Sequence, residues 1–225
     1  MKKNILIFVM LVFSHLAMSQ ELRLNTYGGY IFDDRVDSYF SNSSYYDGVI
    51  KGGFQWGAGL EYHIPGKGAI EIQYLRQDTN APTIYQDGGI FNGSIQNTDF
   101  DLALNWIMLN GTRYFPVSEM VEPFVGAGIG MGIFALENPE NNRSSNATKL
   151  AWSLRGGTNI WLAENVAFRV QASLMSAVQS VGGGFYFGTG GSGAGLSTYS
   201  SMYQFGFEGG LVFRIPQQKS ATASR

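Results

Sequence analysis

Cysteine is absent from this chain of 225 residues, and charged residues are scarce. Without a thiol the protein has no disulfide framework, no thiolate metal site and no cysteine nucleophile. Charged residues make up 14% of the chain, against roughly 25% in ordinary soluble domains, so its surface is not conventionally polar. The formal net charge is -2 and like charges form no block, which gives no indication of a nucleic-acid partner.

Long hydrophobic runs are also missing once the first twenty residues are set aside. Those residues begin with Lys2 and Lys3, continue as an apolar core and end in small residues at Ala17 and Ser19. This is the order of a secretory signal peptide, so we expect residues 1–19 to be removed and the mature chain to be exported. An N-terminal membrane anchor is the alternative, for which the apolar run is short. No later window reaches the roughly 20 apolar residues of a spanning helix, so a mature chain that enters a membrane must cross it as strands.

Apolar residues of the mature chain alternate with polar residues or glycine, which is the period of a β-strand. No segment has a convincing helical period. Eight strands are therefore predicted, near residues 22–32, 53–64, 69–77, 98–115, 122–135, 148–162, 165–177 and 203–215.

The connections between these segments alternate strictly in length. Long connections, rich in Asn, Ser, Gly, Asp and Tyr, occupy residues 34–48, 78–97, 137–147 and 178–199, and short ones occupy 65–68, 116–121 and 163–164. Long loops at one end and tight turns at the other are typical of outer-membrane barrels. We predict an all-β fold, an eight-stranded antiparallel up-and-down transmembrane β-barrel over residues 20–215, with both termini on the periplasmic side.

A soluble ligand-binding barrel of the lipocalin type is the main alternative, because it also has eight up-and-down strands. Its polar face would lie outside and would carry abundant lysine and glutamate. In this chain the polar face is rich in glycine, including Gly126, Gly128, Gly130 and Gly132. These glycines indicate a crowded interior in which side chains of other strands need room, which favours the membrane barrel.

The charged residues of the polar face predict a salt-bridge network inside the barrel, from its periplasmic end up to about mid-height. An ion in a narrow barrel must be paired or hydrated, because its transfer to low dielectric costs several kcal/mol. The expected members are Arg23, Glu61, Glu71, Arg113, Arg155, Arg169, Glu208 and Arg214. Since eight strands enclose a space that side chains can fill, a plugged core is favoured over a conducting pore.

Strict alternation in the fourth segment assigns its large apolar residues to the lipid face. They are Phe100, Leu102, Leu104, Trp106, Met108 and Tyr114. The same parity places Arg76 and Asn110 towards lipid. Arginine at mid-bilayer costs about 2–4 kcal/mol and much less at the interface, so we expect Arg76 at the outer rim or turned by a bulge.

Four stretches give the chain a family resemblance: AIEIQYLRQD at 69–78, NGTRYFP at 110–116, EPFVGAGIGMGIF at 122–134, and the last strand. With them the mature chain resembles the small outer-membrane barrels of the OmpA/OmpX type, in a form common in the Bacteroidota. The resemblance implies insertion by the barrel-assembly machinery, among outer-membrane lipid and lipopolysaccharide. It also implies a signal for that machinery, which Glu208, Gly210, Phe213 and Ile215 match in spacing. A polar tail at residues 216–225 follows, where many such proteins end at the aromatic residue.

Candidate catalytic and cofactor features are weak. His63 is the single histidine after the signal peptide, and its predicted place at the periplasmic end indicates a packed interior residue rather than a base beside a nucleophile. Gly188, Gly190 and Gly193 match a dinucleotide fingerprint, but the strand and helix that this fingerprint needs are not predicted around it. We expect no enzyme activity, no metal and no cofactor.

Function is therefore expected to reside in the long loops, where such barrels vary and bind. The expected contact residues for an extracellular protein or surface ligand are Tyr39, Phe40, Tyr45, Tyr46, Phe185, Tyr186 and Phe187. The sequence predicts a monomeric outer-membrane protein for envelope integrity or surface interaction. A small solute channel, an accessory barrel of a secretion or uptake complex and, last, a lipid-modifying enzyme are the alternatives.

Overall fold

The computed structural model describes residues 21–41, 44–64, 66, 68–86, 95–139, 143–178, 184–186, 193–195 and 202–216. The predicted signal peptide, the glycine fingerprint apart from Gly193 and nearly all of the polar tail lie outside these residues, so those expectations stay predictions. No helix in the described part of the chain is long and apolar enough to cross a membrane.

Twelve strands are present within the described ranges. They are β1 (Glu21–Ile31), β2 (Asp34–Ser41), β3 (Ser44–Ile50), β4 (Gly53–Ile64), β5 (Gly68–Gln86), β6 (Ile95–Tyr114), β7 (Val121–Asn138), β8 (Arg143–Ala163), β9 (Val166–Ala177), β10 (Gly184–Tyr186), β11 (Gly193–Gly195) and β12 (Met202–Ile215).

Eight of these strands close into an antiparallel barrel. Hydrogen bonding runs in the order β4, β1, β12, β9, β8, β7, β6, β5, and β5 pairs back with β4. The last strand closes on the first, with Leu22 opposite Ile215 and Gly28 opposite Gly209. The predicted fold class, an eight-stranded antiparallel up-and-down barrel, is confirmed.

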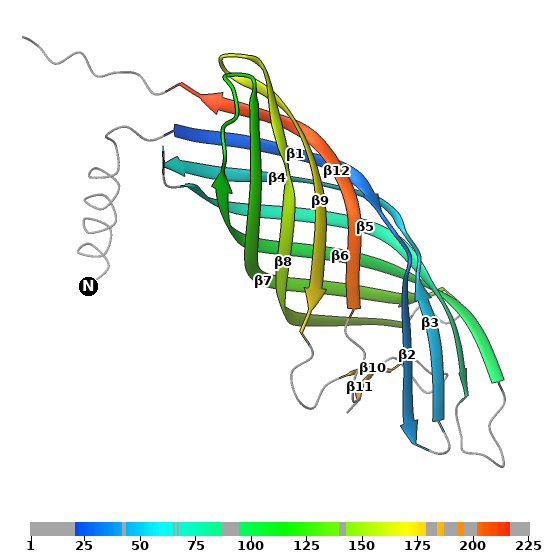
Figure 1. The fold of residues 1–225 in the computed structure, drawn as a ribbon. Coiled ribbons are helices and arrows are strands. Elements are labelled where there is room, and N and C mark those ends of the chain that lie inside the picture. Colours follow the sequence, from blue (N-terminus) through cyan, green and yellow to red (C-terminus); the bar gives the residue numbers. More distant parts are fainter. Residues whose placement is uncertain are drawn as a thin grey trace, which may run out of the picture.

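The remaining strands are additions at one end of the barrel. β2 and β3 form a hairpin in the first long connection, and β3 also pairs with the end of β5 through Tyr46 and Tyr85. Figure 1 shows this hairpin extending beyond the end of the barrel opposite to the start of β1 and the end of β12. That end is the extracellular one in the predicted topology.

In seven barrel strands the burial pattern follows the predicted faces. Large apolar side chains such as Phe54, Ile72 and Phe207 are exposed on the outside, while polar ones such as Gln55 and Glu71 are buried inside. Arg76 points outward on β5, where Arg76 Nη2 pairs with Asp78 Oδ1 at 2.6 Å.

The predicted faces of β6 are wrong. Its large apolar residues assigned to lipid, from Phe100 to Tyr114, are all buried in the barrel, and Asn110 is fully buried with them. Arg113 is exposed on the outside and is not part of the interior network.

The error has a physical cause, because both faces of β6 carry apolar residues. In the half of β6 nearer the periplasmic end, Ile107 and Leu109 point outward to lipid. In the other half, Asp99 and Asp101 point outward. Outward carboxylates are the side chains expected of a strand that continues beyond the bilayer into water, and we interpret this half in that way. Shifting parity by one residue exchanges every side chain between the two faces.

The alternating glycines of β7 leave room for interior side chains, as predicted. A Cβ on Gly128 would overlap the side chains of Asn110 and Ser153, and one on Gly126 would lie 3.0 Å from Arg155 Nε. A Cβ on Gly132 would overlap the ring of Phe134. These glycines allow larger groups from neighbouring positions to fill the lumen.

We predict that Gly128→Val destabilises the barrel, whereas Gly111→Val on the outward face does not. Overpacking a filled interior costs about 1–3 kcal/mol, and the nearest atom to a Cβ on Gly111 is the Ala127 carbonyl oxygen at 3.9 Å. Urea unfolding of both variants in lipid vesicles measures the difference. Equal midpoints would show that the glycines of β7 are not needed for packing.

Candidate functional site

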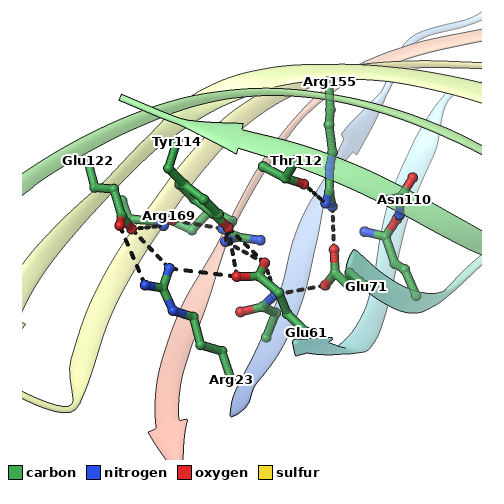
Figure 2. Close-up of polar contacts among 12 residues, drawn as sticks. Arg23, Glu61, Glu71, Asn110, Thr112, Tyr114, Glu122, Arg155 and Arg169 are labelled. Atoms are coloured by element: carbon green, nitrogen blue, oxygen red, sulfur yellow. Dashed lines mark hydrogen bonds and ion pairs between the residues drawn. The ribbon is translucent and has the colours of Figure 1, made fainter. Parts of the chain in front are cut away.

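A cluster of ionised side chains crosses the lumen near the periplasmic end (Figure 2). It contains three arginines and three glutamates, and we call it the interior charge network: Arg23, Glu61, Glu71, Glu122, Arg155 and Arg169. Each is at most 6% exposed. They come from six strands, β1, β4, β5, β7, β8 and β9, and their formal charges cancel.

Arg23 and Glu122 form the pair nearest the periplasmic rim. Arg23 Nη1 lies 3.0 Å from Glu122 Oε2 and 3.6 Å from Glu61 Oε1. The guanidinium also lies over the rings of Tyr114 and Trp161, at 5.1 Å from each centroid. Glu122 is not among the network residues predicted from the sequence, although it shares the inward face of β7 with Phe124.

Arg169 joins several partners at the centre of the network. Its Nη2 lies 3.4 Å from Glu61 Oε2. Its Nη1 donates to the hydroxyl of Tyr27 and its Nη2 to that of Tyr114, both at 2.9 Å. Its Nε donates to Asn159 Oδ1 at 2.8 Å. Such a buried arginine is tolerated because its donors meet a carboxylate and neutral oxygens together.

Arg155 and Glu71 reach towards each other from opposite strands, as Figure 2 shows, and Arg155 Nη1 lies 2.5 Å from Glu71 Oε2. Arg155 Nη2 donates to Thr112 Oγ1 at 2.6 Å. Glu71 Oε1 accepts from Asn25 Nδ2 at 2.7 Å and from the Tyr27 hydroxyl. Both ions are thus hydrogen-bonded as well as paired.

The other predicted members of the network lie elsewhere. Arg214 is at the periplasmic rim, where its Nε lies 2.8 Å from Glu21 Oε1 and its guanidinium 3.5 Å from the centroid of the Trp161 ring. Glu21 also pairs with Arg23, which links this rim to the network. Glu208 is buried higher in the barrel and accepts hydrogen bonds from Gln171 and Ser173.

Above the network, amide and apolar side chains line the lumen together. Asn110 Nδ2 donates to Gln73 Oε1 at 2.9 Å, and Gln204 Nε2 donates to Gln77 Oε1 at 3.1 Å. Nearer the extracellular end, a buried apolar cluster includes Leu75, Phe100, Leu104, Trp106, Met108, Phe134 and Met175. Gln77 is opposite Leu104 and Gln204 is opposite Met175 in the ladder, so amide and apolar side chains share this part of the interior.

The remaining candidate residues do not join this cluster. The ring of His63 packs on that of Tyr114, with 5.2 Å between centroids. Within the described residues no group of three His, Cys, Asp or Glu could hold a metal ion.

The other predicted sites lie on the last strand and in the loops. The predicted assembly signal lies on β12. Its Glu208 is buried inside the barrel, while Phe213 and Ile215 lie on the opposite face of the strand from the inward Val212. The side chains of the predicted loop contacts, Tyr39, Phe40, Tyr45, Tyr46, Phe185, Tyr186 and Phe187, lie outside what the structure describes.

Solved structures with the same fold include proteins of different kinds. Neisserial surface protein A aligns with a TM-score of 0.54 at 12% identity, covering 88% of this chain and 97% of that one. OprG of Pseudomonas aeruginosa gives 0.53 at 11% identity, covering 88% and 97%. The protease OmpT of Escherichia coli gives 0.52 at 8% identity, covering 88% and 98%. At these identities the likeness shows the fold alone.

Family comparison identifies the chain more specifically. No curated protein matches its sequence significantly. Residues 5–178 match the outer membrane protein beta-barrel domain, which is more than half of the chain. The protein therefore belongs to the outer membrane protein beta-barrel domain family, and its location is the outer membrane.

Proposed function

We propose that this protein is a non-enzymatic barrel with a closed interior, which holds an interaction surface outside the outer membrane. The observation that carries the proposal is the interior charge network, in which ion pairs join strands across the lumen. A barrel filled in this way supports a stiff scaffold rather than a path for solutes.

The ion pairs connect strands that are not neighbours in the barrel. Arg23 on β1 meets Glu122 on β7, Arg155 on β8 meets Glu71 on β5, and Arg169 on β9 meets Glu61 on β4. Each pair reaches across the lumen, so that side chains occupy the space between the two strands. Together with the apolar cluster above them, these pairs favour a plugged interior.

The extracellular end supplies a surface for interaction. Asp33 Oδ1 accepts from the Gly52 N–H at 2.8 Å, and Asp34 Oδ2 accepts from the Tyr203 N–H at 2.8 Å. The Gly52 N–H and the Lys51 ammonium lower the pKa of the exposed Asp33 carboxyl, so it stays ionised. These contacts fix the base of the β2–β3 hairpin to the barrel, which makes the hairpin a suitable platform for a partner at the cell surface.

The purified protein is expected to give no steady single-channel steps in planar lipid bilayers, because the interior charge network and buried apolar side chains such as Leu104 and Trp106 occupy its lumen. A porin purified in the same detergent is the positive control for reconstitution. Reproducible steps of one size, present with this protein and absent from detergent alone, would favour the channel and contradict the closed interior.

Glu71→Ala is expected to lower stability by about 3–5 kcal/mol, since it leaves the buried Arg155 without its carboxylate. The double variant Glu71→Leu, Arg155→Met should cost less, because neither buried charge remains. Urea unfolding in vesicles compares them, with Glu119→Ala in an exposed turn as the control. A double variant less stable than Glu71→Ala would contradict this expectation, because the ion pair would then contribute more than its desolvation costs.

The cellular role is tested by complementing a deletion strain with the native gene and with a form in which a short turn replaces residues 34–50. Loss of attachment or cell–cell contact with only the shortened form supports surface interaction through the hairpin. Detergent sensitivity that both forms repair equally supports envelope integrity through the barrel itself. Normal attachment and detergent resistance, with slowed uptake of a small solute, would contradict the proposal.

A further inference from the structure

The outside of the barrel carries a groove near its periplasmic end, with a volume of about 610 Å³. It lies across β5, β6, β7 and β8, and its lining includes Ile70, Gly111, Arg113, Ala127 and Leu154. This face belongs to the lipid-exposed band rather than to the lumen. The groove is therefore open to the acyl chains of the membrane.

Strand register explains how the groove forms. One outward row runs Ile70, Gly111, Ala127 and Leu154, each directly opposite the next on the adjacent strand. The two central positions have little or no side chain, while Ile70 and Leu154 are 52% and 51% exposed and rise on either side.

Larger side chains border the groove on its extracellular side. The next outward row towards the extracellular end pairs Ile72 with Leu109, Leu109 with Ile129, and Ile129 with Trp152. Leu109 and Ile129 are 49% and 66% exposed. The groove is thus a depression with a small-residue floor, apolar walls and an apolar upper edge.

A cation lies at the periplasmic edge of the groove. Arg113 is the last residue but one of β6, and its exposed side chain faces out at the periplasmic end of the groove. Its Nη1 donates to the Gly66 carbonyl at 3.1 Å, which holds the guanidinium beside the turn between β4 and β5. A guanidinium has five donors in a fork that suits phosphate.

We propose that this groove binds one glycerophospholipid of the periplasmic leaflet. An acyl chain lies over Gly111 and Ala127, and the phosphate lies against Arg113. The charge decides the occupant, because Arg113 places a cation at the end of the groove where the headgroups of this leaflet lie. Lipopolysaccharide occupies the opposite leaflet. The inference goes beyond the proposed surface role and is independent of it.

The test is native mass spectrometry of the full-length mature protein, extracted in mild detergent and titrated with phosphatidylglycerol. One retained phospholipid is expected for the native chain. Ala127→Leu should lower retention by about tenfold, because its side chain fills the floor of the groove and removes the packing contacts that an acyl chain makes there. Gly111→Val fills the same floor from β6 and should act alike, which keeps the test valid if Ala127→Leu does not fold.

The matched control is Ala58→Leu. Ala58 is also exposed on the outside, between Thr26 and Tyr74, away from the groove. This variant should retain phospholipid as the native chain does. Folding of every variant is checked by its heat-dependent shift in gel mobility.

The phosphate contact is tested separately with Arg113→Gln. Loss of a charge-assisted hydrogen bond should lower phosphatidylglycerol retention by about tenfold and leave diacylglycerol, which has no phosphate, unchanged. Arg76→Gln, an outward arginine towards the other end of the barrel, is the control. Equal retention by Ala127→Leu, Gly111→Val and Ala58→Leu would overturn the proposal. It would also fail if the native chain appeared as a dimer that Ala127→Leu dissociates, since a second copy would then occupy the groove.

Discussion

A backbone amide in hydrocarbon has no water to bond, so every N–H and C=O of a spanning strand needs a partner in another strand. The pairing of β12 with β1 meets this requirement by closing the sheet. Closure at eight strands then fixes the width of the lumen. Charged residues that point into so narrow a space have to meet one another, and the charge-balanced cluster of arginines and glutamates follows from that constraint.

The cluster also depends on neutral groups. The hydroxyls of Tyr27 and Tyr114 accept from Arg169, while Tyr27 also donates to Glu71 and Tyr114 to Glu61. Each tyrosine therefore connects a cation with an anion. This bridging lets three arginines lie close together, because the Nε, Nη1 and Nη2 groups of Arg169 each meet an oxygen acceptor.

Much of this architecture could be predicted from the sequence, because period-2 alternation and alternating loop lengths are local properties. Parity alone also placed Glu61, Glu71, Arg155 and Arg169 inside. It failed on β6, where both faces carry apolar residues and the choice depends on where the strand leaves the membrane. Glu122 was not predicted for a related reason. It is the second residue of β7, so too few residues of the strand precede it to establish the alternation. The pairing of Arg23 with Glu122, 99 positions apart, depends on closure and cannot be read from either segment alone.

The change of polarity along the outward face of β6 also limits how far the barrel can move into or out of the membrane. Asn105 is opposite Arg76 in the ladder and accepts hydrogen bonds from Arg76 and Tyr74, while Ile107 and Leu109 follow directly towards the periplasmic side. Sinking the barrel by one row would place an arginine and an amide in hydrocarbon, and raising it would expose two aliphatic side chains to water. The change of side-chain chemistry along β6 therefore opposes movement of the barrel along the membrane normal in both directions.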